Sequence, residues 1–280
     1  MSGVDVLGKP LRDCRIGVAG CGAMGLPMLR QLIAHGFDAR GFDVRPLPQF
    51  ASHQALMEMD SARFGAHTDI LISVVRDAAQ NADLCFDVQK IFAAACHPRV
   101  LIISSTLSPA QFHDIAGRLP QDVTAIDAPM SGAPVAAEAG TLTFMVGADG
   151  EWFASLQPLF AAMGGKINHL GAPGSGMSVK VLNNYVAACS VVAVRTVLAR
   201  AAALGVDPAR LLDIMRQSSG GTWFGDHFDR IDWARQGYDP GNTIGILEKD
   251  VGCALVAAGQ GETGFDRALL DALRALQPTG

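Results

Sequence analysis

Short apolar runs alternate with helical patterns through the first part of the chain. The runs are rich in β-branched side chains and are bounded by Gly, Asp and Pro, as strands are. Seven of them are predicted strands: Arg15–Ala19, Asp38–Asp43, Ile70–Val75, Val100–Ser104, Val123–Asp127, Leu142–Val146 and Ile167–Leu170. Between the runs, apolar residues recur at helical spacing, as in Met24–His35, which Gly36 ends. This order predicts a parallel sheet with helical crossovers.

The pattern changes around Gly171, where Gly, Pro and Ser gather in the loop Gly171–Gly176. Beyond the loop the strand patterns largely stop and helical spacing takes over. The predicted helices there are Met177–Leu204, Asp207–Gln217, Ile244–Ala258 and Asp266–Ala275. We therefore expect an α/β domain over residues 1–172 and an all-α domain over 173–280, with a long interdomain helix at the junction.

The composition is that of a globular protein. Of the 280 residues, 49% are hydrophobic and 18% are charged, which excludes a disordered or fibrous chain. The formal net charge is −5. This charge offers no electrostatic footprint for nucleic acid or an anionic membrane, so neither is an expected partner.

Cysteine and histidine spacing gives no support for a metal site. The six cysteines are scattered without a C-x-x-C pair, and the seven histidines form no H-E-x-x-H motif. The first residues lack the charged and apolar regions of a signal peptide. The most apolar stretch, Tyr185–Val194, is too short to span a bilayer. We expect a soluble, cytoplasmic protein.

The first predicted strand runs directly into a glycine-rich turn, Gly20-Cys-Gly-Ala-Met-Gly25, and then into a helix. In such a turn the glycines allow a tight bend, the close approach of a pyrophosphate and close helix–strand packing, and the helix N-terminus attracts the phosphates. A bare G-x-G-x-x-G is weak evidence, but its position after the first strand is the one a Rossmann-type, doubly wound sheet requires. The residues expected to bind the dinucleotide are Gly20, Gly22, Ala23, Met24 and Gly25.

An acidic residue follows at the distance that this motif requires. Asp43 stands 18 residues after Gly25, at the end of the next strand. A carboxylate there accepts hydrogen bonds from the ribose hydroxyls and repels a 2′-phosphate, which favours NAD. Arg45 keeps NADP open, because an arginine in this loop can pair with a phosphate. We interpret Arg45 as a solvated loop residue and predict NAD.

Three polar residues interrupt the apolar stripe of the long helix. Lys180, Asn183 and Asn184 lie at i, i+3 and i+4 and share one face. A lysine on a core stripe is costly unless it is paired, and such rule-breaking is expected at functional sites. The alternative is a lysine that extends its amine to solvent from the first turn. Patterning alone leaves both interpretations open.

These features together resemble the β-hydroxyacid dehydrogenase family, which includes 3-hydroxyisobutyrate dehydrogenase. The resemblance extends from Ile16 to about Ala258. The segments that carry it, in chain order, are Gly20–Met28, Asp127–Gly132 with Gly140–Thr143, Gly174–Gly176 with Lys180, Asn183 and Asn184, Ser218–Gly220 with Trp223, and Lys249–Asp250.

The resemblance implies a role for each candidate residue. Lys180 would be the general acid/base, and Asn184 would hold the substrate hydroxyl or the lysine. The backbone of Ser131 and Gly132 would bind the substrate carboxylate. The other implied residues are Ala133, Asn183 and Trp223 for the substrate, and Val75, Thr106 and Lys249 for the cofactor.

Two positions depart from the family pattern. Ala133 stands where the family usually has a second glycine, and it keeps the N–H needed for carboxylate binding if its φ is negative. Val75-Arg76 stands where the family commonly has Leu-Pro, which adds a cation close to the cofactor.

The resemblance implies oxidation of the hydroxyl of a small β-hydroxy acid, such as 3-hydroxyisobutyrate, by hydride transfer to NAD. An NADPH-dependent reductase of a small aldehyde acid, such as succinic semialdehyde or glyoxylate, is the alternative. A catalytically silent dinucleotide-binding protein is disfavoured, because it would have little reason to keep Lys180 and Asn184. We also expect a homodimer or homotetramer through the helical domain.

Overall fold

The computed structural model describes residues 5–259 and 261–279. Its contacts divide the chain into two compact units, Met1–Lys180 and Val181–Gly280. The boundary predicted between residues 172 and 173 stays a prediction. Residues 1–4, on which the expected lack of a signal peptide partly depends, lie outside the described residues.

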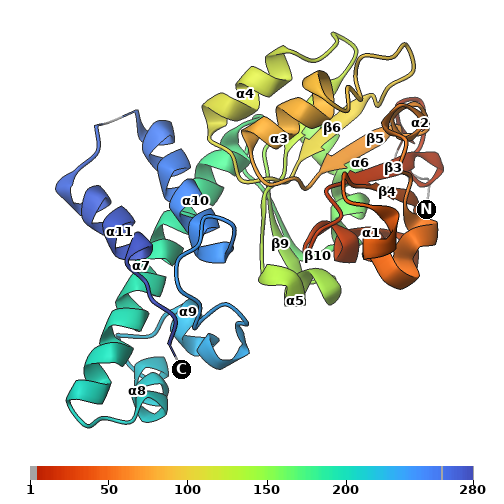
Figure 1. Cartoon of the computed structure of the whole chain (residues 1–280). Helices are drawn as coiled ribbons and strands as arrows, with labels where there is room; N and C mark the ends of the chain where they lie inside the picture. Colours follow the sequence, from red (N-terminus) through yellow and green to blue (C-terminus); the bar gives the residue numbers. More distant parts are fainter. Residues whose placement is uncertain (1–4, 260, 280) are drawn as a thin grey trace. The chain divides into compact units, whose positions relative to one another are not determined.

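A parallel sheet of five strands forms the centre of the first unit (Figure 1). Its strands are β3 (Arg15–Ala19), β4 (Asp38–Phe42), β5 (Ile70–Ser73), β6 (Val100–Ile103) and β7 (Thr124–Asp127). The order across the sheet is β4-β3-β5-β6-β7. Strands β4 and β5 therefore lie on opposite sides of β3, which is the doubly wound arrangement that the sequence predicts. The fold class is confirmed.

Three further strands form a separate sheet, which the sequence did not distinguish from the first. They are β8 (Met130–Ser131), β9 (Leu142–Val146) and β10 (Gly164–His169), in the order β10-β9-β8. Strand β9 pairs in parallel with β10 and antiparallel with β8. One antiparallel bridge, between Asp127 and Gly147, connects the two sheets. Pro129 follows β7 and has no N–H with which to extend that ladder. A two-stranded hairpin, β1 (Asp5–Val6) with β2 (Lys9–Pro10), precedes the main sheet.

Helices cover both faces of the main sheet. Alternate strand residues point to opposite faces, so Ile70 and Ile72 pack in one buried cluster with Met28 of α1, while Leu71 packs in another with Phe112 of α4. The helical segments of this unit are η1 (Leu11–Asp13), α1 (Gly25–Ala34), η2 (Leu47–Leu56), α2 (Ser61–Ala66), α3 (Ala78–Ala82), η3 (Asp83–Asp87), α4 (Pro109–Gly117), α5 (Ala133–Glu138) and α6 (Gly150–Ala161).

The second unit contains helices joined by loops, and no strand among its described residues. Its elements are α7 (Ser175–Ala203), which begins in the first unit, α8 (Pro208–Arg216), α9 (Trp223–Asp226), η4 (Phe228–Arg230), α10 (Thr243–Ala258) and α11 (Gly264–Arg274). Local signals begin these helices: Asn242 accepts backbone N–H groups at the start of α10, and Thr263 forms a capping box with Asp266 at α11. Val191, Val251 and Leu273 belong to the shared core of this unit.

The long helix corrects one expectation. The stretch that the sequence pattern singled out, Tyr185–Val194, is too short to cross a membrane. By length and composition alone, the segment Ser175–Ala201 is long and apolar enough to do so. This is weak evidence for a membrane span, because the core helix of a soluble protein passes the same test. Only 28% of its most apolar window is buried, so much of its apolar surface is uncovered in the single chain.

Candidate active site

The glycine turn lies where the strand order reverses, between the ends of β3 and β5. A methyl group on Gly20 would lie 2.8 Å from the backbone of Val74 and Val75, and one on Gly25 would lie 2.1 Å from the Gly20 carbonyl oxygen. A methyl group on Gly22 would meet nothing within 4 Å. Gly20 and Gly25 are therefore needed for packing, whereas Gly22 leaves open space for a ligand. These residues fit a dinucleotide pyrophosphate at the N-terminus of α1.

The neighbouring residues of the turn differ in exposure. Ala23 is exposed, and Met24 is half-buried at the residue before α1. Cys21 is buried, and burial raises the pKa of its thiol to about 12. Cys21 is therefore a small packed residue in this structure.

Arg45 lies in a loop with its side chain 43% exposed, as its interpretation as a solvated loop residue requires, and it also pairs with Asp43. Its Nε and Nη2 donate to the two carboxylate oxygens of Asp43, each at 3.0 Å. Its backbone N–H donates to Asp43 Oδ1 at 3.0 Å. A short chain separation and the fork geometry of guanidinium make this pair possible. Both carboxylate oxygens of Asp43, the predicted ribose-binding residue, therefore already accept hydrogen bonds from Arg45.

Two predicted cofactor residues, Val75 and Thr106, follow β5 and β6 and are half-buried. Buried Asn81 connects these two strand ends. Its Oδ1 accepts from Ser73 Oγ at 2.7 Å, and its Nδ2 donates to Ser105 Oγ at 3.1 Å. No pattern in the sequence singles out Asn81, because its partners lie on other elements.

Lys180 is 7% exposed, and its Nζ donates to the carbonyl oxygen of Met130 at 2.7 Å. Met130 directly precedes Ser131, the first residue of the segment expected to bind the substrate carboxylate. The alternative interpretation, an amine extended to solvent, is therefore wrong. The lysine is buried and held beside the predicted substrate segment.

Asp127 was not among the predicted site residues, yet it fixes the start of the helix that carries Lys180. This fully buried carboxylate accepts the backbone N–H of Gly174 at 2.6 Å and that of Met177 at 2.7 Å. A methyl group on Gly147 would lie 2.1 Å from Asp127 Oδ1. Burial raises the pKa of Asp127 to about 6, although the hydrogen bonds from Gly174 and Met177 oppose the shift.

The predicted carboxylate-binding turn contains a strained residue. Gly132 has a φ of 138°, and Ala133 has a φ of 59°. The condition that φ at Ala133 is negative is therefore not met. An alanine in the left-handed region costs about 1–2 kcal/mol, which a glycine avoids. The N–H of Ala133 is retained in this conformation.

The second unit brings together three of the named residues around Asp250. This carboxylate is 1% exposed and accepts from Asn184 Nδ2 at 2.5 Å, and Lys249 Nζ lies 2.8 Å from its other oxygen. Asn183 is exposed and donates to Asn184 Oδ1 at 3.1 Å. The sequence identified the Lys249-Asp250 pair but not the role of the aspartate, which orients both Asn184 and Lys249.

Trp223, the predicted pocket wall, begins α9 and is 54% exposed. Its ring stacks on that of His227 at 4.6 Å between centroids. The indole is therefore at the surface of its unit and outside its core.

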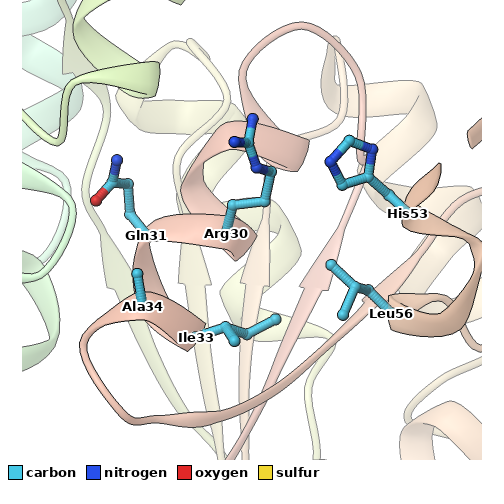
Figure 2. A pocket seen from close by; sticks show the side chains of 6 residues that line it. All are labelled: Arg30, Gln31, Ile33, Ala34, His53 and Leu56. Atoms are coloured by element: carbon cyan, nitrogen blue, oxygen red, sulfur yellow. The ribbon is translucent and has the colours of Figure 1, made fainter.

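A cavity of about 310 Å³ lies away from these residues. Figure 2 shows the side chains that line it, from the C-terminal half of α1 and from η2. The glycine turn is at the opposite end of α1, so this cavity is not the candidate site. Within residues 5–259 and 261–279, no three His, Cys, Asp or Glu side chains gather to hold a metal ion.

The doubly wound sheet and the open glycine turn define a dinucleotide-binding fold. Residues 15–171 match the family model for the NAD-binding domain of 6-phosphogluconate dehydrogenase. Residues 174–273 match the model described as NAD-binding of NADP-dependent 3-hydroxyisobutyrate dehydrogenase. The chain belongs to the β-hydroxyacid dehydrogenase family and is an NAD(P)-dependent oxidoreductase.

Named relatives cover most of the chain. An L-threonate dehydrogenase of Cupriavidus necator is 32% identical over 87% of this chain and 83% of its own length. An NAD-dependent L-serine dehydrogenase of Pseudomonas aeruginosa is 32% identical over 87% of this chain and 85% of its own length. A solved structure of 3-hydroxyisobutyrate dehydrogenase from Mycobacterium tuberculosis with L-serine is 29% identical, with a TM-score of 0.74 over 92% of this chain and 91% of that one.

Proposed function

We propose that the chain oxidises the hydroxyl of a small β-hydroxy acid of the size of 3-hydroxyisobutyrate, 3-hydroxypropionate, serine or glycerate. The observation that carries this proposal is the buried amine of Lys180, held at 2.7 Å on the Met130 carbonyl beside Ser131. The names of the relatives, which are dehydrogenases of threonate, serine and 3-hydroxyisobutyrate, support this substrate class.

Lys180 acts as the general acid/base in this proposal. A bound NAD(P) would supply the acceptor for the hydride of the alcohol carbon. Lys180 Nζ takes the proton of the same hydroxyl and returns it in the reverse direction. Met130 O accepts one N–H of the amine and so limits its orientations, while Asn184, one turn further along α7, holds the substrate hydroxyl.

The substrate carboxylate binds the backbone N–H groups of Ser131 and Gly132, and Ala133 lies next to them in the same turn. The family resemblance assigns Asn183 and Trp223 to the substrate and Lys249 to the cofactor. Asp250 supports this arrangement because it neutralises Lys249 and holds the amide of Asn184. Gly20, Gly22, Ala23, Met24 and Gly25 bind the pyrophosphate, with Val75 and Thr106 towards the nicotinamide.

The enzyme is a cytoplasmic homodimer or homotetramer in this proposal. Leu182 and Val186 lie one turn apart on α7 and are 60% and 63% exposed. Exposed apolar side chains in a row favour burial against another surface, and a second copy of the same helix is the partner we propose.

The test is the initial rate of nicotinamide reduction with NAD and with NADP, over a panel of small 3-hydroxy acids. We expect turnover on at least one acid and a fall of kcat by about 10²–10⁴-fold in Lys180→Ala, since that is the usual contribution of a general acid/base. Binding of the reduced cofactor should change little in this variant. Lys166→Ala is the matched control, because Lys166 is exposed on β10. Equal turnover in wild type and Lys180→Ala would contradict the mechanism.

A further inference from the structure

Side chains connect the carboxyl ends of β5 and β6 beyond the point where the pairing of the two strands ends. The paired residues end at Ser73 and Ile103, and the backbone N–H of Ser104 donates to Ser73 O at 2.8 Å just after them. Val75 and Thr106, which we place towards the nicotinamide, follow these two strand ends. The groups that fix the distance between the two segments therefore affect the binding of the cofactor.

Asn81 lies in α3, is fully buried and joins the two segments. Its Nδ2 donates to Asp77 O at 2.8 Å and to Ser105 Oγ at 3.1 Å, and its Oδ1 accepts from Ser73 Oγ at 2.7 Å. Because the carbonyl oxygen of Asp77 can only accept, the nitrogen of the amide must face it, which fixes the orientation of the amide. Both donors and the acceptor of the amide are then in use, and a satisfied buried network of this kind is rigid.

The segment after β5 also depends on α3 for its shape. The backbone N–H of Arg76 donates to Gln80 Oε1 at 3.0 Å, and Asp77 Oδ1 accepts the backbone N–H of Gln80 at 2.9 Å. The proline that the family commonly has at position 76 has no N–H for the first of these bonds, but its ring restricts the backbone directly. In this chain, side chains of α3 therefore supply the restriction that a proline would give.

The same segment contacts the glycine turn. A methyl group on Gly20 would lie 2.8 Å from the backbone of Val74 and Val75. The backbone N–H of Val74 donates to Ala19 O at 2.8 Å. The segment after β5 therefore lies where the strand order reverses, which is the position at which a doubly wound sheet binds a dinucleotide across its crevice.

We propose that Asn81 is a positioning residue for the nicotinamide half of the cofactor. It joins the segment after β5 to the segment after β6 and so fixes the spacing of Val75 and Thr106. This inference rests on the proposed function, which places these two residues towards the nicotinamide. Asn81 acts through them and does not itself touch the cofactor.

The test compares the binding of NADH and of ADP to the full chain, measured by isothermal titration calorimetry without substrate. ADP carries the adenosine and the pyrophosphate of the cofactor and lacks the nicotinamide riboside. We expect Asn81→Ala to weaken NADH about 10-fold. Ser105→Ala removes only the bond to the segment after β6 and should weaken NADH about 3- to 10-fold.

Both variants should change the dissociation constant of ADP by less than about twofold, because the glycine turn keeps its own contacts. A general loss of folded protein would weaken both ligands alike. The difference between NADH and ADP therefore measures positioning and not stability.

Ser104→Ala is the matched control. Ser104 precedes Ser105 and is also buried, but its hydroxyl has no hydrogen-bond partner among the residues that the structure describes. Its loss removes the same atom as Ser105→Ala without breaking a hydrogen bond. Both dissociation constants should therefore stay within about twofold of the wild-type values.

Three outcomes would overturn the role of Asn81 and leave the proposed oxidation untouched. They are equal weakening of NADH and ADP in Asn81→Ala, unchanged NADH binding in both Asn81→Ala and Ser105→Ala, and equal weakening of NADH in Ser104→Ala and Ser105→Ala. Wild-type protein that bound NADH no more tightly than ADP would instead remove the placement of Val75 and Thr106, and the role of Asn81 with it. Turnover of the hydroxy acids tests the oxidation separately, so the two failures are distinguishable.

Discussion

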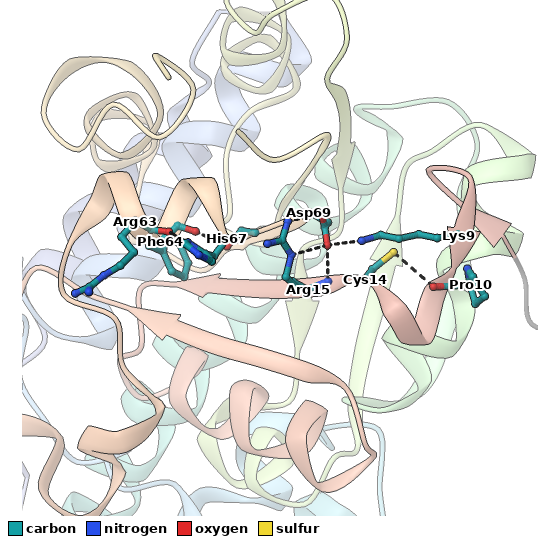
Figure 3. A network of polar contacts seen from close by, with 9 residues as sticks. Lys9, Pro10, Cys14, Arg15, Arg63, Phe64, His67 and Asp69 are labelled. Carbon is teal, nitrogen blue, oxygen red and sulfur yellow. Dashed lines mark hydrogen bonds and ion pairs between the residues drawn. The ribbon is translucent and has the colours of Figure 1, made fainter. Parts of the chain in front are cut away.

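Asp69 accepts several hydrogen bonds just before β5, remote from the candidate site. It precedes β5 and accepts the backbone N–H of Arg15 at 2.7 Å, the Arg15 Nη2 at 3.0 Å and Lys9 Nζ at 2.8 Å (Figure 3). Burial opposes its ionisation, but the hydrogen bonds with Arg15 and Lys9 outweigh burial and lower the pKa of Asp69 to about 2. The ionised form is therefore stabilised in the folded state.

This shift predicts the acid dependence of one variant. Because the folded pKa lies below the unfolded value of 3.8, Asp69 contributes stability above pH 4 that is lost as the pH falls towards 2. Its cationic partners are partly exposed, so we expect Asp69→Asn to lower the free energy of unfolding at pH 7 by only about 1–2 kcal/mol. Urea unfolding at several pH values measures the difference, which should shrink below pH 4. A difference that grew with acid would contradict the assignment.

At Ala133 the structure departs from the negative φ that the sequence allowed. An alanine and a glycine have the same N–H, so the sequence permitted a negative φ and an unstrained turn. The surrounding fold holds Ala133 at a φ of 59° instead. No local signal predicts this value, because it follows from how β8 enters α5.

At the scale of elements, the segment after β7 holds α7 at two points. Asp127 accepts N–H groups at the start of the helix, and Met130 O accepts from Lys180 further along it. The two contacts join residues that are about 50 positions apart in the chain. Asp127 therefore helps to position the buried lysine through the start of the helix that carries it.

Asp127 should make the stability of the protein fall as the pH rises. Its folded pKa of about 6 lies above the unfolded value of 3.8, so its stabilising contribution is fully present below pH 4 and is lost as the pH rises to about 6. Asp127→Asn removes this titration. We expect the free energy of unfolding of the wild type to fall by roughly 2 kcal/mol, relative to that of the variant, between pH 4 and pH 6.

Denaturant unfolding of both proteins between pH 4 and pH 7 provides the measurement. His113 lies close to Gly174 and interacts electrostatically with Asp127, so His113→Gln in both backgrounds serves as the control. A stability difference that stayed constant across this range would show that the pKa of Asp127 is not raised.

At the scale of the whole molecule, the exposed apolar row on α7 predicts self-association. Leu182→Glu places a charge on this row and should turn the oligomer into a monomer with little change in secondary structure. Sedimentation velocity measures the state. Val88→Glu is the control, because Val88 is 64% exposed and lies in the first unit. A wild-type monomer, or an oligomer unaffected by Leu182→Glu, would exclude this interface.

The sequence by itself determined the elements and the glycine turn, since both depend on local rules. Strand and helix periods identified β3, β9 and the four longer helices of the second unit, and Gly20–Gly25 followed β3 as a dinucleotide turn requires. Lys180 and Asn184 stood out because polar residues break an apolar stripe. These features depend on neighbours within a few positions.

Tertiary structure alone decided which groups these residues meet. Met130 O binds Lys180, Asp250 binds Asn184, and β8–β10 separate from the main sheet. The partners of Asp127 on α7 likewise come from elsewhere in the chain. Even for Asp43 and Arg45, two positions apart, the sequence could not show that the arginine turns onto the carboxylate, because Cys21 and Phe50 help to fix its side chain. Periodicity describes which face a residue occupies, whereas its hydrogen-bond partner depends on how distant segments pack.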